Sequence, residues 1–234
     1  MSDPIDRLAN HLANQAAPSP PPLSAALESE LTHLDAVAPR RPMRELSILL
    51  GISFVYGAGL VAALTMRRDM HELPVSFIIG AAVAWVLGFA VPCYMALVPR
   101  AGAVTPKPQL ALVSAIIASI GFVALGLLVH PSGPSSTSYG WHNFARGHTC
   151  LEIGLASAFV PVLIGALFLR GALPVGSRWI AAALGAGGGC LGGLVLHLHC
   201  HVADALHVGL VHGGVVIVAA LLSAAVVPRA TTLR

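Results

Sequence analysis

Charged residues are scarce in this chain. Only 10% of its 234 residues are Asp, Glu, Lys or Arg, whereas 56% are hydrophobic. A mean hydropathy of +0.81 lies far outside the range of soluble domains. The formal net charge of +3 is too small to indicate a nucleic-acid partner. The shortage of charge therefore excludes an ordinary soluble domain and a direct role in nucleic-acid binding.

Sequence signals of several other protein classes are also missing. The chain has no phosphate-binding loop and no motif for a serine nucleophile. The first 45 residues are polar and the first apolar run starts only at Leu46, so no cleavable signal sequence is expected. Four cysteines are too few for a disulfide scaffold. We therefore assign no catalytic residue and expect no enzymatic activity.

Long apolar runs are what the chain has instead. Each can form a helix that crosses a hydrocarbon core about 30 Å thick, which takes roughly 20 residues. The runs are continuous rather than alternating, which disfavours a strand barrel. The predicted fold class is all-α: a polytopic membrane bundle of six transmembrane helices (residues 46–228), a short cytoplasmic N-terminal helical arm (1–45) and a cytoplasmic tail (229–234). The predicted spans are Leu46–Met66, Pro74–Val98, Gln109–His130, Leu151–Leu169, Trp179–Leu198 and Leu206–Val227.

The distribution of basic residues predicts the orientation in the membrane. With the N-terminus in the cytoplasm, ten Lys and Arg residues fall on inner segments and three on outer segments. Such an excess on the inside is the usual rule, so both termini are expected in the cytoplasm, at a bacterial inner membrane. Histidines follow the opposite pattern: nine of the eleven lie on or near the outer segments and only His11 and His33 are cytoplasmic. This asymmetry indicates a function at the outer face.

The N-terminal arm is predicted to be a separate unit that binds a partner. Two short amphipathic helices are predicted, joined by a proline-rich hinge at residues 17–22. Helices this short cannot bury a core alone and would order in the groove of a partner; the alternative is a solvated tail lying on the membrane. The candidate partner-binding residues are the apolar positions Ile5, Leu8, Leu12, Leu23, Leu27, Leu31 and Leu34.

Cysteine and histidine gather at the expected outer boundary. Cys150 begins the fourth span and Cys200 follows the fifth. These two candidate redox residues could form a disulfide in an oxidising periplasm. Alternatively, they could remain thiols that neighbouring imidazoles make reactive. With the histidines they could instead hold zinc or another divalent metal, although no cofactor is certain. The candidate metal ligands are Cys150, His148, His197, His199, Cys200, His201, His207 and His212.

An alternative interpretation of the same region is that the protein is an intramembrane zinc-dependent hydrolase. Asp204, His207 and His212 would hold a metal that activates water. The five-residue step between the two histidines is less suitable than the His-x-x-x-His step that places two ligands on one face of an α-helix. A metal transporter or haem protein is a third reading, but mid-span histidines are absent.

The second half of the chain resembles the NrsF family of six-span bacterial membrane anti-sigma factors. The features that carry the resemblance are Cys150, a span containing Pro161, the segment 169–174, a glycine-rich fifth span, and Leu198-His199-Cys200 followed by Asp204, His207 and His212-Gly213. One departure is His201, where family members often have proline. The chain also resembles the six-span light-response anti-sigma regulators of myxobacteria, so the stimulus stays open.

The resemblance implies a function in transcription regulation. The arm would sequester an extracytoplasmic-function sigma factor, and Cys150 and Cys200 would sense metal or redox stress. The expected partners are this sigma factor and membrane lipid, with a homodimer left open and no direct contact with nucleic acid.

Overall fold

The computed structural model describes residues 24, 40–103, 105–129, 144–145, 147–170 and 177–231. The chain separates into two units, Met1–Arg40 and Arg41–Arg234. The candidate partner-binding positions of the arm lie outside the described residues, so the arm remains a prediction. The second unit is described below.

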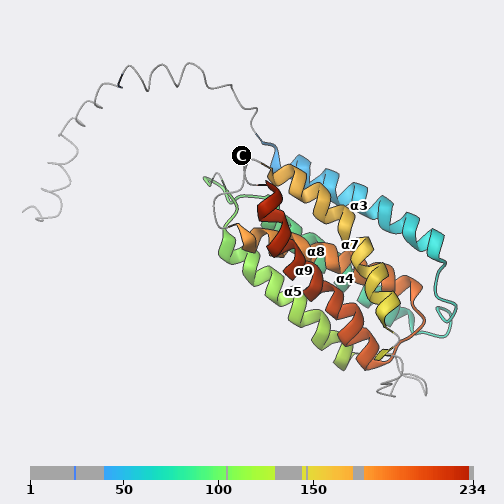
Figure 1. Ribbon diagram of the computed structural model, residues 1–234. Helices are drawn as coiled ribbons and strands as arrows, with labels where there is room; N and C mark the ends of the chain where they lie inside the picture. Colours follow the sequence, from blue (N-terminus) through green and yellow to red (C-terminus); the bar gives the residue numbers. More distant parts are fainter. Residues whose placement is uncertain are drawn as a thin grey trace, which may run out of the picture. The chain divides into compact units, whose positions relative to one another are not determined.

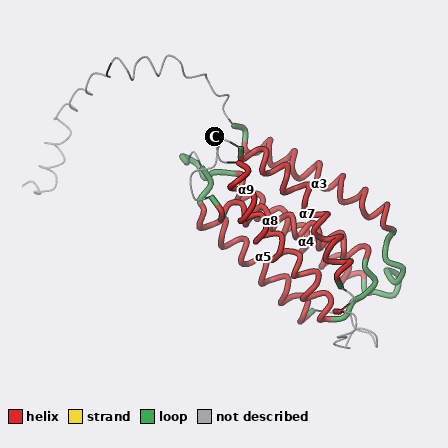
Figure 2. The backbone as a smooth tube through the Cα atoms, viewed as in Figure 1, coloured by secondary structure: helices red, strands yellow, loops and turns green. Residues whose placement is uncertain are grey.

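Among the described residues of this unit, six helices are long and apolar enough to cross a membrane. Figure 1 shows them side by side, and Figure 2 shows only helices and loops in the described part of the chain. The predicted all-α fold with six candidate spans is therefore confirmed. In chain order the elements are α3 (Pro42–Leu64), α4 (Val75–Leu97), α5 (Pro108–Leu128), α7 (His148–Leu169), α8 (Arg178–His199), the π-helix η1 (His207–His212) and α9 (Gly213–Thr231).

The predicted boundaries differ from these by up to four residues. Helix α3 starts at Pro42, four residues before the predicted Leu46. Proline suits the first turn of a helix, because its fixed φ is already helical and its missing N–H is not needed there. Pro108 begins α5 in the same way. Three further prolines, Pro92 in α4, Pro161 in α7 and Pro228 in α9, lie inside continuous helices.

Helix α8 is the buried centre of the bundle. Of its most apolar 18-residue window 94% is buried, against 17–28% for α3, α4, α5 and α7. Its glycines allow the neighbouring backbones to approach closely: a Cβ on Gly189 would lie 2.6 Å from Cα of Val216 in α9, and one on Gly188 would lie 2.9 Å from the carbonyl oxygen of Ala158 in α7. Only glycine leaves room for such contacts.

Aromatic rings and two cysteines complete the packing around α8. Trp85 stacks on Phe122 of α5 with the ring centroids 3.8 Å apart, and a Cβ on Gly193 would lie 2.2 Å from the Trp85 ring. Cys93 and Cys190 are fully buried and belong to the same hydrophobic cluster. These two thiols are core packing residues.

The outward faces of the surrounding helices are apolar. Large hydrophobic side chains are exposed along them, including Val55, Ile79, Ile117 and Leu221. In water such a surface would be an aggregation hazard, whereas lipid tails solvate it without cost. The exposed apolar belt therefore supports a multi-pass membrane protein.

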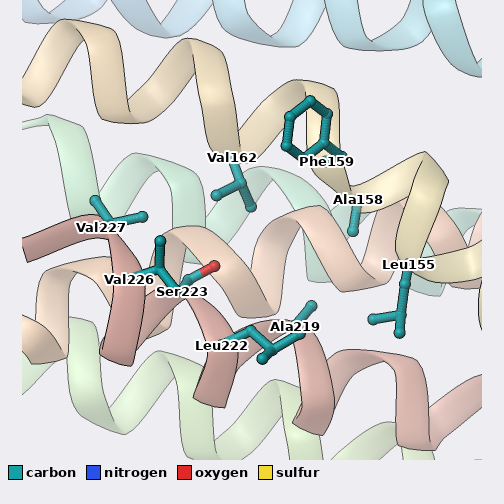
Figure 3. Close-up of a pocket in the computed structure, with 9 residues that line it drawn as sticks. All are labelled: Leu155, Ala158, Phe159, Val162, Ala219, Leu222, Ser223, Val226 and Val227. Atoms are coloured by element: carbon teal, nitrogen blue, oxygen red, sulfur yellow. The ribbon is translucent and has the colours of Figure 1, made fainter. Parts of the chain in front are cut away.

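A groove of about 280 Å³ runs between α7 and α9 on this surface. Figure 3 shows its lining, in which Phe159 comes from α7 and Leu222 from α9. Ser223 is the one polar side chain among the nine lining residues, and its hydroxyl oxygen would lie 2.5 Å from a Cβ on Gly185 of α8. The lining of the groove is otherwise apolar.

Gly192→Val is expected to lower the thermal unfolding temperature of the detergent-solubilised protein, because a Cβ at this position would lie 2.3 Å from the carbonyl oxygen of Gly154 in α7. Overpacking of this kind costs about 1–3 kcal/mol. Gly59→Val in α3 is the matched control, since a Cβ there meets no atom within 4 Å. Equal losses in the two variants would contradict the close packing of α8.

Candidate functional site

Four cysteine and histidine side chains meet at one end of the bundle. Cys150 lies in the first turn of α7, Cys200 directly follows α8, and His207 and His212 are the two ends of η1. One potential ligand atom from each lies within 4.8 Å of the other three. We call these four residues the Cys/His cluster. Cys200, His207 and His212 are buried and Cys150 is half-buried.

The closest contacts in the cluster join at Cys200. Its Sγ atom accepts a hydrogen bond from the Cys150 thiol at 3.7 Å and lies 3.5 Å from Nε2 of His207. Both cysteines are free thiols. Hydrogen bonds from Cys150 and then from His207 lower the pKa of Cys200 against the opposing effect of burial. The arrangement therefore favours a thiolate at Cys200.

The π-helix explains why two histidines five residues apart can act together. In an α-helix a five-residue step turns a side chain away from its partner, but in a π-helix residues i and i+5 are hydrogen-bonded neighbours. The rings of His207 and His212 accordingly lie edge to face, with centroids 5.0 Å apart. The five-residue spacing is therefore compatible with a shared site, because these residues form a π-helix rather than an α-helix.

Two glycines create space for η1 beside α5. A Cβ on Gly126 would lie 2.6 Å from Cα of Gly209, so the two helices touch backbone to backbone. A Cβ on Gly209 would in turn lie 2.7 Å from the Leu127 side chain. The wider π-turn is thus accommodated at a point where both helices lack side chains.

Asp204 holds the start of this last helix. Its buried carboxylate accepts a hydrogen bond from the backbone N–H of His207 at 3.0 Å. The backbone N–H of Val208 donates to the Asp204 carbonyl oxygen, also at 3.0 Å. This is the geometry of a helix N-cap. Asp204 thereby fixes the position of His207.

A second anchor joins the end of α8 to the loop after α3. Arg67 is buried and its guanidinium pairs with both carboxylate oxygens of Asp69, at 2.8 and 2.7 Å. The same guanidinium donates to the carbonyl oxygen of His197 at 3.3 Å, and the Arg67 backbone N–H donates to that of Leu198 at 2.9 Å. We call these contacts the Arg67 clamp. They satisfy carbonyl groups at the end of α8 that a helix leaves unpaired.

Backbone geometry at Thr65 supports the clamp. Thr65 ends α3 with φ 68°, in the left-handed region that a β-branched residue rarely adopts. Its carbonyl oxygen lies 2.8 Å from Nδ1 of His199. The contacts to α8 thus hold the chain in a sharp turn directly after α3.

The other candidate ligands lie apart from the cluster. His197 is buried with Nε2 at 3.2 Å from the carbonyl oxygen of Ile78, and His199 lies against Thr65 as described. His148 and His201 are exposed. The structure therefore brings together four of the eight candidates, Cys150, Cys200, His207 and His212, and gives the two other buried or half-buried histidines backbone partners.

The comparison with known families decides the class of the protein. The sequence model of the family described as "Negative regulator of sigma F", NrsF, matches residues 31–232. The chain belongs to the NrsF family. The predicted resemblance is thus confirmed, and it covers the six-helix unit together with the end of the arm. Neither the curated proteins nor the solved structures gave a match.

The NrsF assignment supports negative regulation of a sigma factor as the function of this protein. Its Cys/His cluster could hold a metal ion, as predicted for this region. The sequence did not predict the three features that position the cluster. These are the Asp204 cap, the Arg67 clamp and the π-helix. Arg67 and Asp69 stand two apart in a polar loop, a pattern too common in sequences to single them out.

Asp69→Asn is expected to destabilise this NrsF protein at neutral pH, because it leaves the buried Arg67 guanidinium without its counter-charge; the cost is of the order of 1–2 kcal/mol. The hydrogen bond with Arg67 lowers the pKa of Asp69 in the folded protein. The ion pair therefore contributes stability above the ordinary carboxyl pKa and loses it as the pH falls through the lowered value.

Thermal unfolding in detergent at several pH values measures this effect. The difference between wild type and Asp69→Asn should shrink in acid. Glu72→Gln is the control. Glu72 is exposed, and its Oε1 atom lies 3.6 Å from Nε2 of His71, which is exposed as well, so this pair is expected to contribute little to stability. A pH-independent difference, or an equal one for Glu72→Gln, would contradict the role of the clamp.

Proposed function

We propose that this NrsF protein is a membrane-bound anti-sigma factor that sequesters an extracytoplasmic-function sigma factor through residues 1–45. The observation that carries the proposal is the family match over residues 31–232. The amphipathic pattern of the arm supports it, because two short helices without a core of their own need a partner's groove. The match begins within the arm, at residue 31.

We further propose that the Cys/His cluster is the input of this regulator and faces the periplasm. The excess of basic residues on the opposite segments supports this orientation. Of the three basic residues on the cluster side, Arg67 is neutralised by its ion pair with Asp69, which reduces the positive charge on that side further. A metal ion or an oxidant arriving from the periplasm would then reach the thiols of Cys150 and Cys200.

The Arg67 clamp supplies a physical route from the cluster to the arm. Cys200 lies two residues after Leu198, and Arg67 donates hydrogen bonds to the carbonyl groups of His197 and Leu198. Arg67 lies three residues after the end of α3, and α3 starts at Pro42, next to the arm. A ligand at the cluster can change sigma-factor binding only through a difference in affinity for two states of the bundle. We expect this change to be a shift of the end of α8 that moves α3 with it, because Arg67 joins the two segments.

The hydrolase alternative gains no specific support. The Asp204 carboxylate accepts a hydrogen bond from the backbone N–H of His207, and the His207 ring contacts the thiol of Cys200. A catalytic zinc site keeps one position open for water, whereas the cluster offers four protein ligands. The regulator is therefore the function that the site supports best.

The arm is tested by capture of the sigma factor with the full-length protein in detergent. Leu27→Asp with Leu31→Asp is expected to reduce capture at least tenfold, because a loss of about 1.4 kcal/mol already gives a factor of ten and two buried leucines are worth more. Ser29→Asp, on the opposite face of the same predicted helix, should capture normally. Undiminished capture by the double variant would contradict the role assigned to the arm.

The input is tested in vesicles that carry the full-length protein with bound sigma factor. A thiophilic divalent metal or an azo oxidant, which takes two electrons and two protons from a thiol pair, is expected to release sigma factor from the wild type. The double variant Cys150→Ser with Cys200→Ser should bind sigma factor and fail to release it. Cys93→Ala controls for cysteine content, since Cys93 lies in the core. An unchanged response in the double variant would contradict the proposed input.

A further inference from the structure

We propose that Cys150, Cys200, His207 and His212 form a closed, tetrahedral metal site of the zinc type. The inference names the ligand set and the class of ion for the input described above. The metal site itself rests on geometry, and only its regulatory role rests on the proposed function.

The separations between the side chains match the edges of a zinc coordination tetrahedron. With Zn–S bonds of about 2.3 Å and Zn–N bonds of about 2.0–2.1 Å, the edges are about 3.8 Å between two sulfur atoms and about 3.6 Å between sulfur and nitrogen. The distance from Cys150 Sγ to Cys200 Sγ is 3.7 Å, and that from Cys200 Sγ to His207 Nε2 is 3.5 Å. The remaining separations, at most 4.8 Å, require only small side-chain rotations to close.

The hydrogen-bonding state of His212 points in the same direction. His212 is 2% exposed, and its Nε2 atom has no hydrogen-bond partner among the described residues. A buried polar atom without a partner carries a free-energy cost, and in native proteins it usually has a functional explanation. A metal ion shared with the neighbouring sulfur atoms would satisfy the imidazole.

Charge balance favours a divalent ion bound by these four groups. Two thiolates and two neutral imidazoles carry a charge of −2, which one divalent cation cancels. A neutral site suits a position enclosed by α7, α8 and η1 near the end of a membrane bundle, where a net charge would be costly. Two sulfur and two nitrogen ligands in a tetrahedron select zinc or a similar thiophilic ion over calcium or magnesium, which prefer oxygen.

The connectivity of the ligands gives the site a structural consequence. Cys150 comes from α7, Cys200 from the end of α8, and the two histidines from η1. One ion would therefore cross-link three segments that are otherwise held together by packing. Since ions that bind only the folded state raise its stability, the metal is expected to stabilise this end of the bundle.

The experiment measures the metal content of the full-length protein purified in detergent, by elemental analysis after dialysis against zinc. The wild type is expected to retain one zinc ion per chain. Cys200→Ser and His212→Gln should each fall to background or bind far more weakly. His148→Gln and His201→Gln, which change exposed histidines outside the cluster, should retain one ion. Cooperative thermal unfolding, measured for every variant, separates loss of the ligand from loss of the fold.

Cobalt(II) in place of zinc reports the ligand set directly. The wild type should show tetrahedral ligand-field bands and thiolate-to-cobalt charge transfer. Cys150→Ser should lose about half of the charge-transfer intensity, whereas His207→Gln should keep it and shift the ligand-field bands. A folded wild type without stoichiometric metal, or with a spectrum that lacks thiolate charge transfer, would overturn the site. Sigma-factor capture measured on the same preparations separates the two proposals, because capture by metal-free protein leaves the anti-sigma function standing.

Discussion

Backbone contact around α8 is the constraint on which the bundle depends. Lipid tails are as apolar as leucine, so helices in a membrane gain little from burying apolar side chains and associate through close packing. Glycines on different faces of α8 provide it: Gly185 and Gly189 meet α9, and Gly188 and Gly192 meet α7. A single helix thereby fixes the positions of its neighbours. The ends of those helices carry the chemically active side chains.

This packing fixes the positions of the side chains in the Cys/His cluster. Cys200 stands at the end of the most buried helix, and the Arg67 clamp fixes the carbonyl groups just before it. His207 is positioned by the Asp204 cap. The same two sulfur atoms cannot both bind a metal and form a disulfide, so the metal and redox interpretations of the sequence describe exclusive states of one site.

Much of the fold could be predicted because membrane thickness fixes the length of each span. The boundaries were missed mainly at α3, where Pro42 allows a helical turn among polar and basic residues that an apolar window leaves out. The cluster was predictable only as a region. Its four residues were all among the candidate ligands, but selecting them required the π-helix and the backbone partners of His197 and His199, which depend on tertiary contacts. The arm remains a prediction.

The π-helix η1 sets the register of α9. A π-turn accommodates one residue more than an α-turn, and each residue of an α-helix advances the chain by about 100°. If η1 relaxed to an α-helix, every residue from Gly213 to Thr231 would have to rotate by a comparable angle or slide along the axis. Val216, which packs on Gly189, would leave its place. The conformation of the six residues from His207 to His212 therefore determines which face of α9 packs against α8.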